Sequence, residues 1–182
     1  MALAGIPVIA GGRLQGALQR AIHTYKYGGR RPLAADLTGL LVTAVGAHGP
    51  SMAALSFVPL HPARLRERGF NQAQRIANEL GRRLSLPVID GLARTRATPA
   101  QVGLGHAERQ LNLEGAFTWT ALAPPPARLA LVDDVCTTGA TLLAALEAVQ
   151  QAGGSISAFL VLARAQSLPA LAVTFPEQPA CS

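Results

Sequence analysis

Apolar residues follow two patterns along the chain, one with helical spacing and one of short continuous runs. Leu14, Leu18 and Ile22 recur at helical spacing, which predicts a short amphipathic helix. A second helix is expected to begin at Pro32, because proline suits the first turn of a helix. The predicted helices cover Arg13–Ile22, Pro32 to about Gly46, Asn71 to about Leu84, a short piece around Ala107–Leu111, and Gly139–Gln151.

Short apolar runs between these helices predict strands. The segment Arg128–Val132 is apolar on both faces, as expected for a strand inside a sheet that is covered on both sides. The predicted strands are Leu55–Leu60, Pro87–Leu92, Ala116–Trp119, Arg128–Val132 and Ile156–Ala163. Strands that alternate with helices predict an α/β fold, with a mostly parallel sheet flanked by helices. No boundary for a second domain is visible, so residues 1–182 are expected to form one domain.

Two segments lack periodicity and are predicted as loops. The first, His61–Phe70, is strongly basic and precedes a helix that Asn71 can cap through its side-chain oxygen. The second, Arg94–Ala107, is long, and long loops in compact domains are usually functional or disordered.

Charge narrows the class of partner. The net charge is +6, and residues 1–128 carry 15 Arg and Lys against six Asp and Glu. This excess favours anionic partners, either phosphorylated metabolites or nucleic acid, although a solvated basic face would have the same composition.

No apolar run is long enough for a membrane span and Met1–Ala10 lacks the basic start of a signal peptide, so a cytoplasmic protein is expected. Cys136 and Cys181 are not spaced as zinc ligands.

The most informative segment is Leu129–Thr141, with the sequence LALVDDVCTTGAT. A buried strand delivers Asp133 and Asp134 at its C-terminal end, where open α/β sheets bind ligands. The loop that follows opens a helix, whose free N–H groups and dipole favour an anion. Threonine hydroxyls add donors, and Gly139 lets the backbone approach the anion. The predicted phosphate-binding residues are Thr137, Thr138, Gly139, Ala140 and Thr141.

The two acids are expected to bind a part of the ligand other than its phosphate, because a carboxylate repels a phosphate. Neutral hydroxyls or a divalent cation suit Asp133 and Asp134 better. A sugar phosphate with a diol satisfies both halves of the segment. The alternative is a strand that ends in solvated acids before a threonine-capped helix, but the complete DDxxTTGxT unit between a strand and a helix favours the sugar phosphate.

This segment resembles the motif with which type I phosphoribosyltransferases bind PRPP (5-phosphoribosyl-1-pyrophosphate). The resemblance implies the type I phosphoribosyltransferase fold, a place in nucleotide metabolism, and Mg²⁺ as the cofactor at the acids. It also implies that Asp133 and Asp134 hold the ribose 2- and 3-hydroxyls while Thr137–Thr141 hold the 5-phosphate. Purine-salvage members commonly carry an aspartate at the position of Thr137 that acts on the base. Since threonine cannot be that general base, 6-oxopurine salvage is disfavoured.

Basic segments elsewhere supply candidate catalytic residues. Arg64, Arg66 and Arg68 could bind a pyrophosphate or a nucleic-acid backbone, unless they form only a solvated loop. Arg94 and Arg96 open the long loop, which resembles the mobile loop that covers PRPP during catalysis. Such a loop would exclude water and bring cations to the departing pyrophosphate.

Four patterns taken together resemble the ComF family of competence-associated proteins. They are HxxKYxG, RxRGFNQ, RxTxxQ…RxxN and DDVxTTGAT, and the match runs from about Arg13 to Arg164. In the first pattern, Lys26 and its neighbouring tyrosines could contact bases or phosphates, or simply pack. Members of this family are linked to DNA uptake in natural transformation and are described as phosphoribosyltransferase-like. Full-length members usually begin with a four-cysteine zinc ribbon, whereas no cysteine precedes Cys136 here, so a short or truncated variant is expected.

Three functions remain open from the sequence. The first is a competence protein that acts on single-stranded DNA with the competence helicase machinery and uses the phosphate site as a sensor or a vestige. The second is an active phosphoribosyltransferase that moves phosphoribose from PRPP to a base or an amine. The third is a nucleotide-binding regulator, and the oligomeric state is left open.

Overall fold

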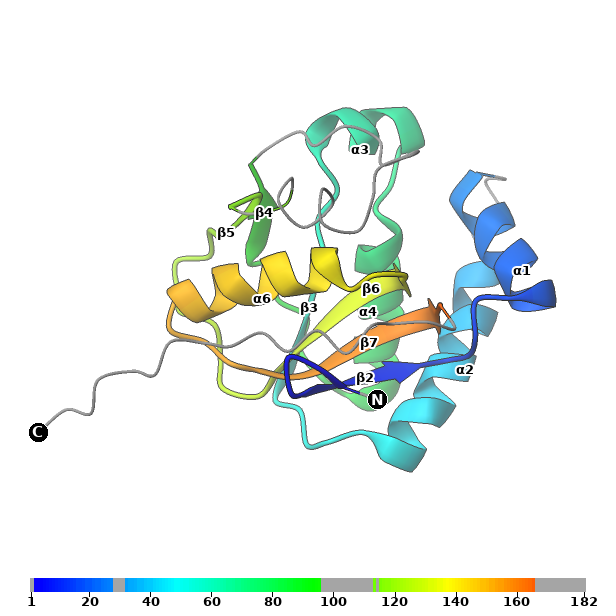
Figure 1. Cartoon of the computed structure of the whole chain (residues 1–182), viewed down its shortest axis with the longest axis horizontal. Helices are drawn as coiled ribbons and strands as arrows, with labels where there is room; N and C mark the ends of the chain where they lie inside the picture. Colours follow the sequence, from blue (N-terminus) through cyan, green and yellow to red (C-terminus); the bar gives the residue numbers. More distant parts are fainter. Residues whose placement is uncertain (1, 28–31, 96–112, 114, 166–182) are drawn as a thin grey trace, which may run out of the picture.

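A five-stranded, mostly parallel sheet forms the centre of the computed structural model, which describes residues 2–27, 32–95, 113 and 115–165 (Figure 1). Its strands are β1 (Ala2–Leu3), β2 (Ile6–Ala10), β3 (Ala54–Phe57), β6 (Leu129–Cys136) and β7 (Ile156–Arg164). Their order in the sheet is β1-β2-β7-β6-β3. The β1–β2 pair is antiparallel, whereas β2–β7, β7–β6 and β6–β3 pair in parallel. The predicted α/β class with a mostly parallel sheet is therefore confirmed.

Helices cover both faces of the sheet because its central strands are apolar on both sides. The helices are α1 (Gly16–Tyr27), α2 (Leu33–His48), α3 (Pro62–Arg68), α4 (Gln72–Leu84) and α6 (Ala140–Gln151). Along β6, Leu129 and Leu131 pack in a cluster with residues of α6, whereas Ala130 and Val132 pack with residues of α1, α2 and α4. Figure 1 shows α6 in front of the sheet and α4 behind it. The predicted arrangement of helices around a sheet is thus confirmed.

The N-terminal strands were not predicted. Ile6–Ala10 is a short apolar run that contains a proline, so its sequence alone does not distinguish a strand from a loop. It becomes a strand because Val8 and Ile9 pair with Phe159 and Leu160 of β7, more than a hundred positions further along the chain. Local patterns cannot reveal such a distant partner.

The predicted strand Pro87–Leu92 is wrong over most of its length. Val88 makes an isolated bridge to Leu55, and a regular strand starts only at its end, as β4 (Leu92–Arg94). This strand pairs antiparallel with β5 (Phe117–Trp119), and the two form a small separate sheet. The prediction of a strand at Ala116–Trp119 is therefore confirmed.

The basic segment predicted as a loop at His61–Phe70 contains a helix, α3. The side chain of His61 accepts a hydrogen bond from Ala63 N–H, Pro62 occupies the first turn, and the N–H of Gly69 closes the end on Leu65. The segment gave no helical pattern of apolar residues because none of the residues of α3 is buried. The capping residues of this segment were the sequence feature from which the helix could have been predicted.

Some predictions fall on residues that the structure does not describe. These are the short helix at Ala107–Leu111, Arg96 and most of the loop that follows Arg94. Among the helices of the described ranges, none combines the length and the apolar character that a membrane span requires.

Candidate functional site

The acidic pair lies where β6 loses one of its two neighbours. β3 pairs with β6 only as far as Phe57 opposite Val132, and the chain then leaves the sheet towards α3. β7 stays paired with β6 up to Cys136, so the predicted end of this strand at Val132 is too early. Asp133 and Asp134 therefore belong to the strand itself, at the carboxyl end of the parallel sheet. The backbone of β6 fixes their position.

Asp133 is held in surroundings that disfavour its charge. Burial, and then the neighbouring charge of Asp134, raise the pKa of Asp133 to about 7. A hydrogen bond from the N–H of Asp134 to Oδ1 of Asp133 (2.7 Å) and the charges of Lys26 and Arg94 partly oppose that shift. Near neutral pH the Asp133 carboxyl can therefore offer either an acceptor or a donor to a hydroxyl group.

Asp134 has a cationic partner that comes from the far end of the sequence. The ammonium group of Lys26, in the last turn of α1, donates to Oδ1 of Asp134 at 2.9 Å. The side chains are only 21% and 14% exposed, so this ion pair is partly withdrawn from water. Lys26 was predicted only as a contact for bases or phosphates, and its position against the acidic pair was missed.

The start of α6 follows the acids directly, as predicted. Thr138 is buried, and its hydroxyl oxygen accepts a hydrogen bond from Ala140 N–H at 3.3 Å, in the turn around the N-cap residue Gly139. Thr137 is exposed, so its hydroxyl is accessible from solvent. At the helix opening, the hydroxyl oxygen of Thr138 is therefore already hydrogen-bonded to the backbone, whereas the hydroxyl group of Thr137 is accessible to a ligand.

Gly139 has a structural role that was not predicted. Its φ of +82° lies in the left-handed region, and a Cβ atom there would lie 2.7 Å from the Leu3 side chain. Leu3 of β1 is buried, so the N-terminal hairpin packs against the start of α6. The absence of a side chain at Gly139 therefore serves this packing, whether or not a ligand also approaches its backbone.

Two of the five predicted catalytic arginines interact with each other beside Asp133. Burial, and then the charge of Arg64, lower the pKa of Arg94, while the charge of Asp133 raises it. The guanidinium group of Arg94 also lies over the ring of Phe117, 5.5 Å from its centre. The charge of Arg94 on β4 thus acts on the carboxyl group of Asp133, and the charge of Arg64 on α3 acts on Arg94.

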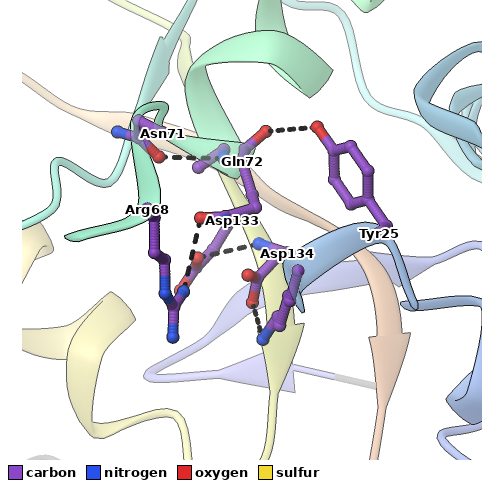
Figure 2. Close-up of polar contacts among 8 residues, drawn as sticks. Tyr25, Arg68, Asn71, Gln72, Asp133 and Asp134 are labelled. Atoms are coloured by element: carbon purple, nitrogen blue, oxygen red, sulfur yellow. Dashed lines mark hydrogen bonds and ion pairs between the residues drawn. The ribbon is translucent and has the colours of Figure 1, made fainter. Parts of the chain in front are cut away.

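The other predicted arginines are placed differently. Arg68 donates from Nη1 to Oε1 of Gln72 at 3.4 Å, and Figure 2 shows its guanidinium group near the acidic pair. Arg66 is exposed on α3, and Arg96 lies outside the described residues. Of these arginines, Arg68 bonds to Gln72, while the charge of Arg94 acts on Asp133 and that of Arg64 acts on Arg94.

A polar network around the start of α4 joins the separate motifs. Tyr25 is fully buried, and its hydroxyl donates to the backbone carbonyl of Gln72 at 3.4 Å. Asn71 caps α4 by accepting from Ala73 N–H at 3.0 Å, as predicted, and its side-chain amide also donates to the carbonyl of Val58 at 3.0 Å. The signal for these residues lay in the HxxKYxG and RGFNQ patterns, but no feature of the sequence showed that the two patterns meet.

The acidic pair by itself is a poor direct site for Mg²⁺. One carboxylate is already engaged by Lys26, and the described part of the chain holds no group of three or more His, Cys, Asp or Glu side chains that could surround a metal ion. Mg²⁺ binds through one or two carboxylates only when phosphates and waters complete its octahedron. The arrangement favours a cation that arrives with a phosphorylated ligand.

Fold and site together define an α/β protein in which an acidic pair at the end of a central strand precedes the opening of a helix. No protein-family model matches the chain. Over 88 residues it is 41% identical to Competence protein F of Haemophilus influenzae (strain ATCC 51907 / DSM 11121 / KW20 / Rd). This match covers 47% of the chain and 38% of that relative, so the chain spans well under two thirds of the length of the relative. The identity over about half of the chain supports a ComF family protein.

Among solved structures, the chain is similar to the crystal structure of TT1426 from Thermus thermophilus. The TM-score is 0.41 at 17% identity, with 75% of this chain and 86% of that chain covered. A likeness of this size carries no argument about fold or function.

Proposed function

We propose that the chain is a ComF-like protein with the type I phosphoribosyltransferase fold, which binds PRPP or a related sugar phosphate and serves DNA uptake in natural transformation. One observation carries this proposal. Asp133 and Asp134, a pair suited to hydroxyls, stand at the carboxyl end of β6 directly before the helix opening of α6, which is suited to a phosphate. The similarity to Competence protein F supports the role in competence.

In the proposed complex, the two halves of the ligand meet different chemistry. The 5-phosphate lies at Thr137–Thr141, where backbone N–H groups and hydroxyls donate to it. The ribose hydroxyls donate to the carboxylates of Asp133 and Asp134. Arg64 and Arg94 face the pyrophosphate, and Mg²⁺, when bound, would neutralise the charge of that pyrophosphate.

Calorimetry with PRPP and Mg²⁺ tests the binding site. We expect Asp134→Asn to weaken PRPP binding about tenfold or more, because a hydrogen bond to a charged group contributes about 1.5–3 kcal/mol and about 1.4 kcal/mol is a factor of ten. Asp90→Asn is the matched control, since Asp90 is exposed and does not belong to the acidic pair. Equal affinity of wild type and Asp134→Asn would show that the acids do not hold the ribose.

A second candidate function, active phosphoribosyl transfer, is favoured by the electrostatic interactions of Arg94 with Asp133 and of Arg64 with Arg94. Two cations at this place would stabilise a departing pyrophosphate. Release of pyrophosphate from PRPP, measured against a panel of bases and amines, tests it. We expect Arg94→Met to abolish any release that wild type shows, whereas the exposed Arg82→Met retains it; no release with any acceptor would leave only the binding role.

Single-stranded DNA and the competence helicase machinery are the proposed macromolecular partners, in the cytoplasm. Arg66 on α3 is exposed, and an exposed guanidinium group can pair with the phosphates of a DNA backbone. Fluorescence anisotropy with single-stranded DNA over a salt series should show a steep loss of affinity with salt. A weak response that does not change with salt would remove DNA as a direct partner.

A further inference from the structure

Lys26 is the only lysine of the chain, and it reaches the acidic pair across a sequence separation of 108 residues. Its ammonium group lies 2.9 Å from Oδ1 of Asp134, and both side chains are largely withdrawn from solvent. Exposed lysines usually form loose ion pairs that contribute little. A partly buried pair at the centre of the candidate site therefore calls for a functional explanation.

The position of Lys26 is fixed by its neighbour. Tyr25 is fully buried, donates its hydroxyl hydrogen to the carbonyl of Gln72, and packs its ring 5.8 Å from the ring of Phe70. These contacts attach the last turn of α1 to the start of α4. Figure 2 shows the consequence, with Tyr25, Gln72 and the acidic pair gathered in one place. Lys26 is thus held next to Asp134 by the buried side chain of Tyr25 and does not lie on a flexible surface segment.

The donors and acceptors that this ion pair leaves free can form hydrogen bonds with a neutral group of a ligand. An ammonium group has three donors, of which the contact with Asp134 uses one. The second oxygen of that carboxylate can still accept a hydrogen bond from a hydroxyl group. A divalent ion at the same carboxylate would compete with the ammonium group for its charge.

We propose that Lys26 is the resident counter-cation of the acidic pair, which takes the place of a directly bound divalent ion at Asp134 and positions this carboxylate for the hydroxyls of a ligand. Lys26 acts through Asp134 and is therefore a positioning residue. The choice of a sugar phosphate as the ligand rests on the proposed function, whereas the relation between the lysine and a metal ion does not. Any divalent ion in the complex then binds to the phosphates of the ligand and not to the acids.

A titration with Mn²⁺ alone tests the exchange of cations. The full chain is titrated by electron paramagnetic resonance as wild type, Lys26→Met and Lys26→Arg. We expect weak binding to wild type and to Lys26→Arg, which retains the charge, and about tenfold tighter binding to Lys26→Met, where the carboxylate of Asp134 is left without its paired cation. Adding Asp134→Asn to Lys26→Met should remove the gain. Equal Mn²⁺ affinity in wild type and Lys26→Met would overturn the proposal.

A second titration uses ribose 5-phosphate in buffer with a chelator. Wild type should bind it without metal, and Lys26→Met should bind it about tenfold more weakly and regain affinity when Mn²⁺ replaces the chelator. Ribose 5-phosphate binding by Lys26→Met that equals wild type without metal would also overturn the proposal. If no variant binds ribose 5-phosphate while the Mn²⁺ results hold, the sugar-phosphate function fails and the role of Lys26 stands. Thermal melts by circular dichroism establish that each variant is folded, and Lys26→Arg provides a folded comparison that keeps the charge.

Discussion

At the scale of single residues, the two neighbouring acids of β6 have opposite surroundings. Asp134 is paired with Lys26, whereas burial and the charge of Asp134 dominate the surroundings of Asp133 and raise the pKa of Asp133. One acid therefore has a cation as its direct partner, and the other is held close to its neutral form. Such a division of roles between adjacent carboxyl groups is common at functional sites, where titratable groups are tuned by burial and by neighbouring charge.

The raised pKa of Asp133 predicts a loss of stability as the pH rises. In the unfolded chain this carboxyl group titrates near its ordinary value, so below about pH 4 it is protonated in both states and the folded state has its full advantage. That advantage falls as the pH rises towards the folded pKa of about 7. We expect Asp133→Asn to be more stable than wild type by about 1–2 kcal/mol at pH 8 and by much less at pH 4, since partial solvation reduces the full effect.

Chemical denaturation at pH 4 and pH 8, with a chelator present, measures this difference. Asp90→Asn serves as the control, because an exposed acid should not change the pH dependence. A constant difference between Asp133→Asn and wild type at both pH values would contradict the prediction.

Gly139 permits a second test at this scale. A comparison with another glycine of almost the same φ distinguishes the cost of backbone strain from the cost of a steric clash. Gly139 and Gly153 have almost the same positive φ, +82° and +81°, but of these two only Gly139 would bring a Cβ atom against another side chain, that of Leu3. We expect Gly153→Ala to lower the free energy of unfolding by about 1–2 kcal/mol and Gly139→Ala by about 2–4 kcal/mol. Thermal and denaturant melts measure both. Equal losses would mean that the contact between β1 and α6 contributes nothing.

At the scale of elements, the sequence was sufficient for those helices and strands whose local signals are strong. The helix at Asn71, the strand before Asp133 and the helix opening after it follow from capping residues, apolar runs and glycine, which act over a few positions. β2 could not be predicted, because its partner β7 is remote in sequence. α3 was missed because an exposed helix has no apolar pattern, although Pro62 and the capping residues around it were present.

The start of α4 leads to a prediction about this element. Asn71 is buried and makes two hydrogen bonds, one that caps α4 and one that joins the helix to the carbonyl of Val58. Asn71→Ala should lower the free energy of unfolding by about 2–3 kcal/mol, because it removes the cap and leaves a carbonyl without its partner.

Denaturant unfolding compares this variant with Asn78→Ala, which lies on the exposed face of the same helix. Asn78→Ala should change stability by no more than about 0.5 kcal/mol. A loss at Asn71 as small as that at Asn78 would show that the start of α4 does not depend on the cap.

At the scale of the whole molecule, the candidate site is a meeting of distant segments. α1 supplies Lys26, α3 and β4 supply Arg64 and Arg94, and β6 supplies the acids. The sequence indicated each of these segments as a candidate but could not show that Lys26 faces Asp134, because a pairing over 108 positions depends on how the helices pack on the sheet. The sequence therefore predicted most of the segments that contribute residues to the site, but it did not predict how those residues face one another.

If Lys26 and Asp134 join the first helix to the centre of the sheet, their interaction should exceed that of an ordinary surface pair. A double-mutant cycle with Lys26→Met and Asp134→Asn should give a coupling energy of about 1–2 kcal/mol, because the pair is partly withdrawn from water. The pair of Glu79 and Arg82 provides the control. It lies within one helix at 2.8 Å, but the arginine side chain is 69% exposed.

The control cycle with Glu79→Gln and Arg82→Met should give a clearly smaller coupling energy, because water and salt screen an exposed pair. The two cycles differ in burial and in the distance along the chain, while the length of each ion pair is nearly the same, 2.9 Å and 2.8 Å. A larger coupling for Lys26 and Asp134 would mean that the contact stabilises the tertiary structure as well as the site, so that displacing Lys26 from Asp134 would loosen α1. Equal couplings would instead mean that α1 is held by its apolar face and by Tyr25 alone, and that Lys26 can exchange its partner without a change in the fold.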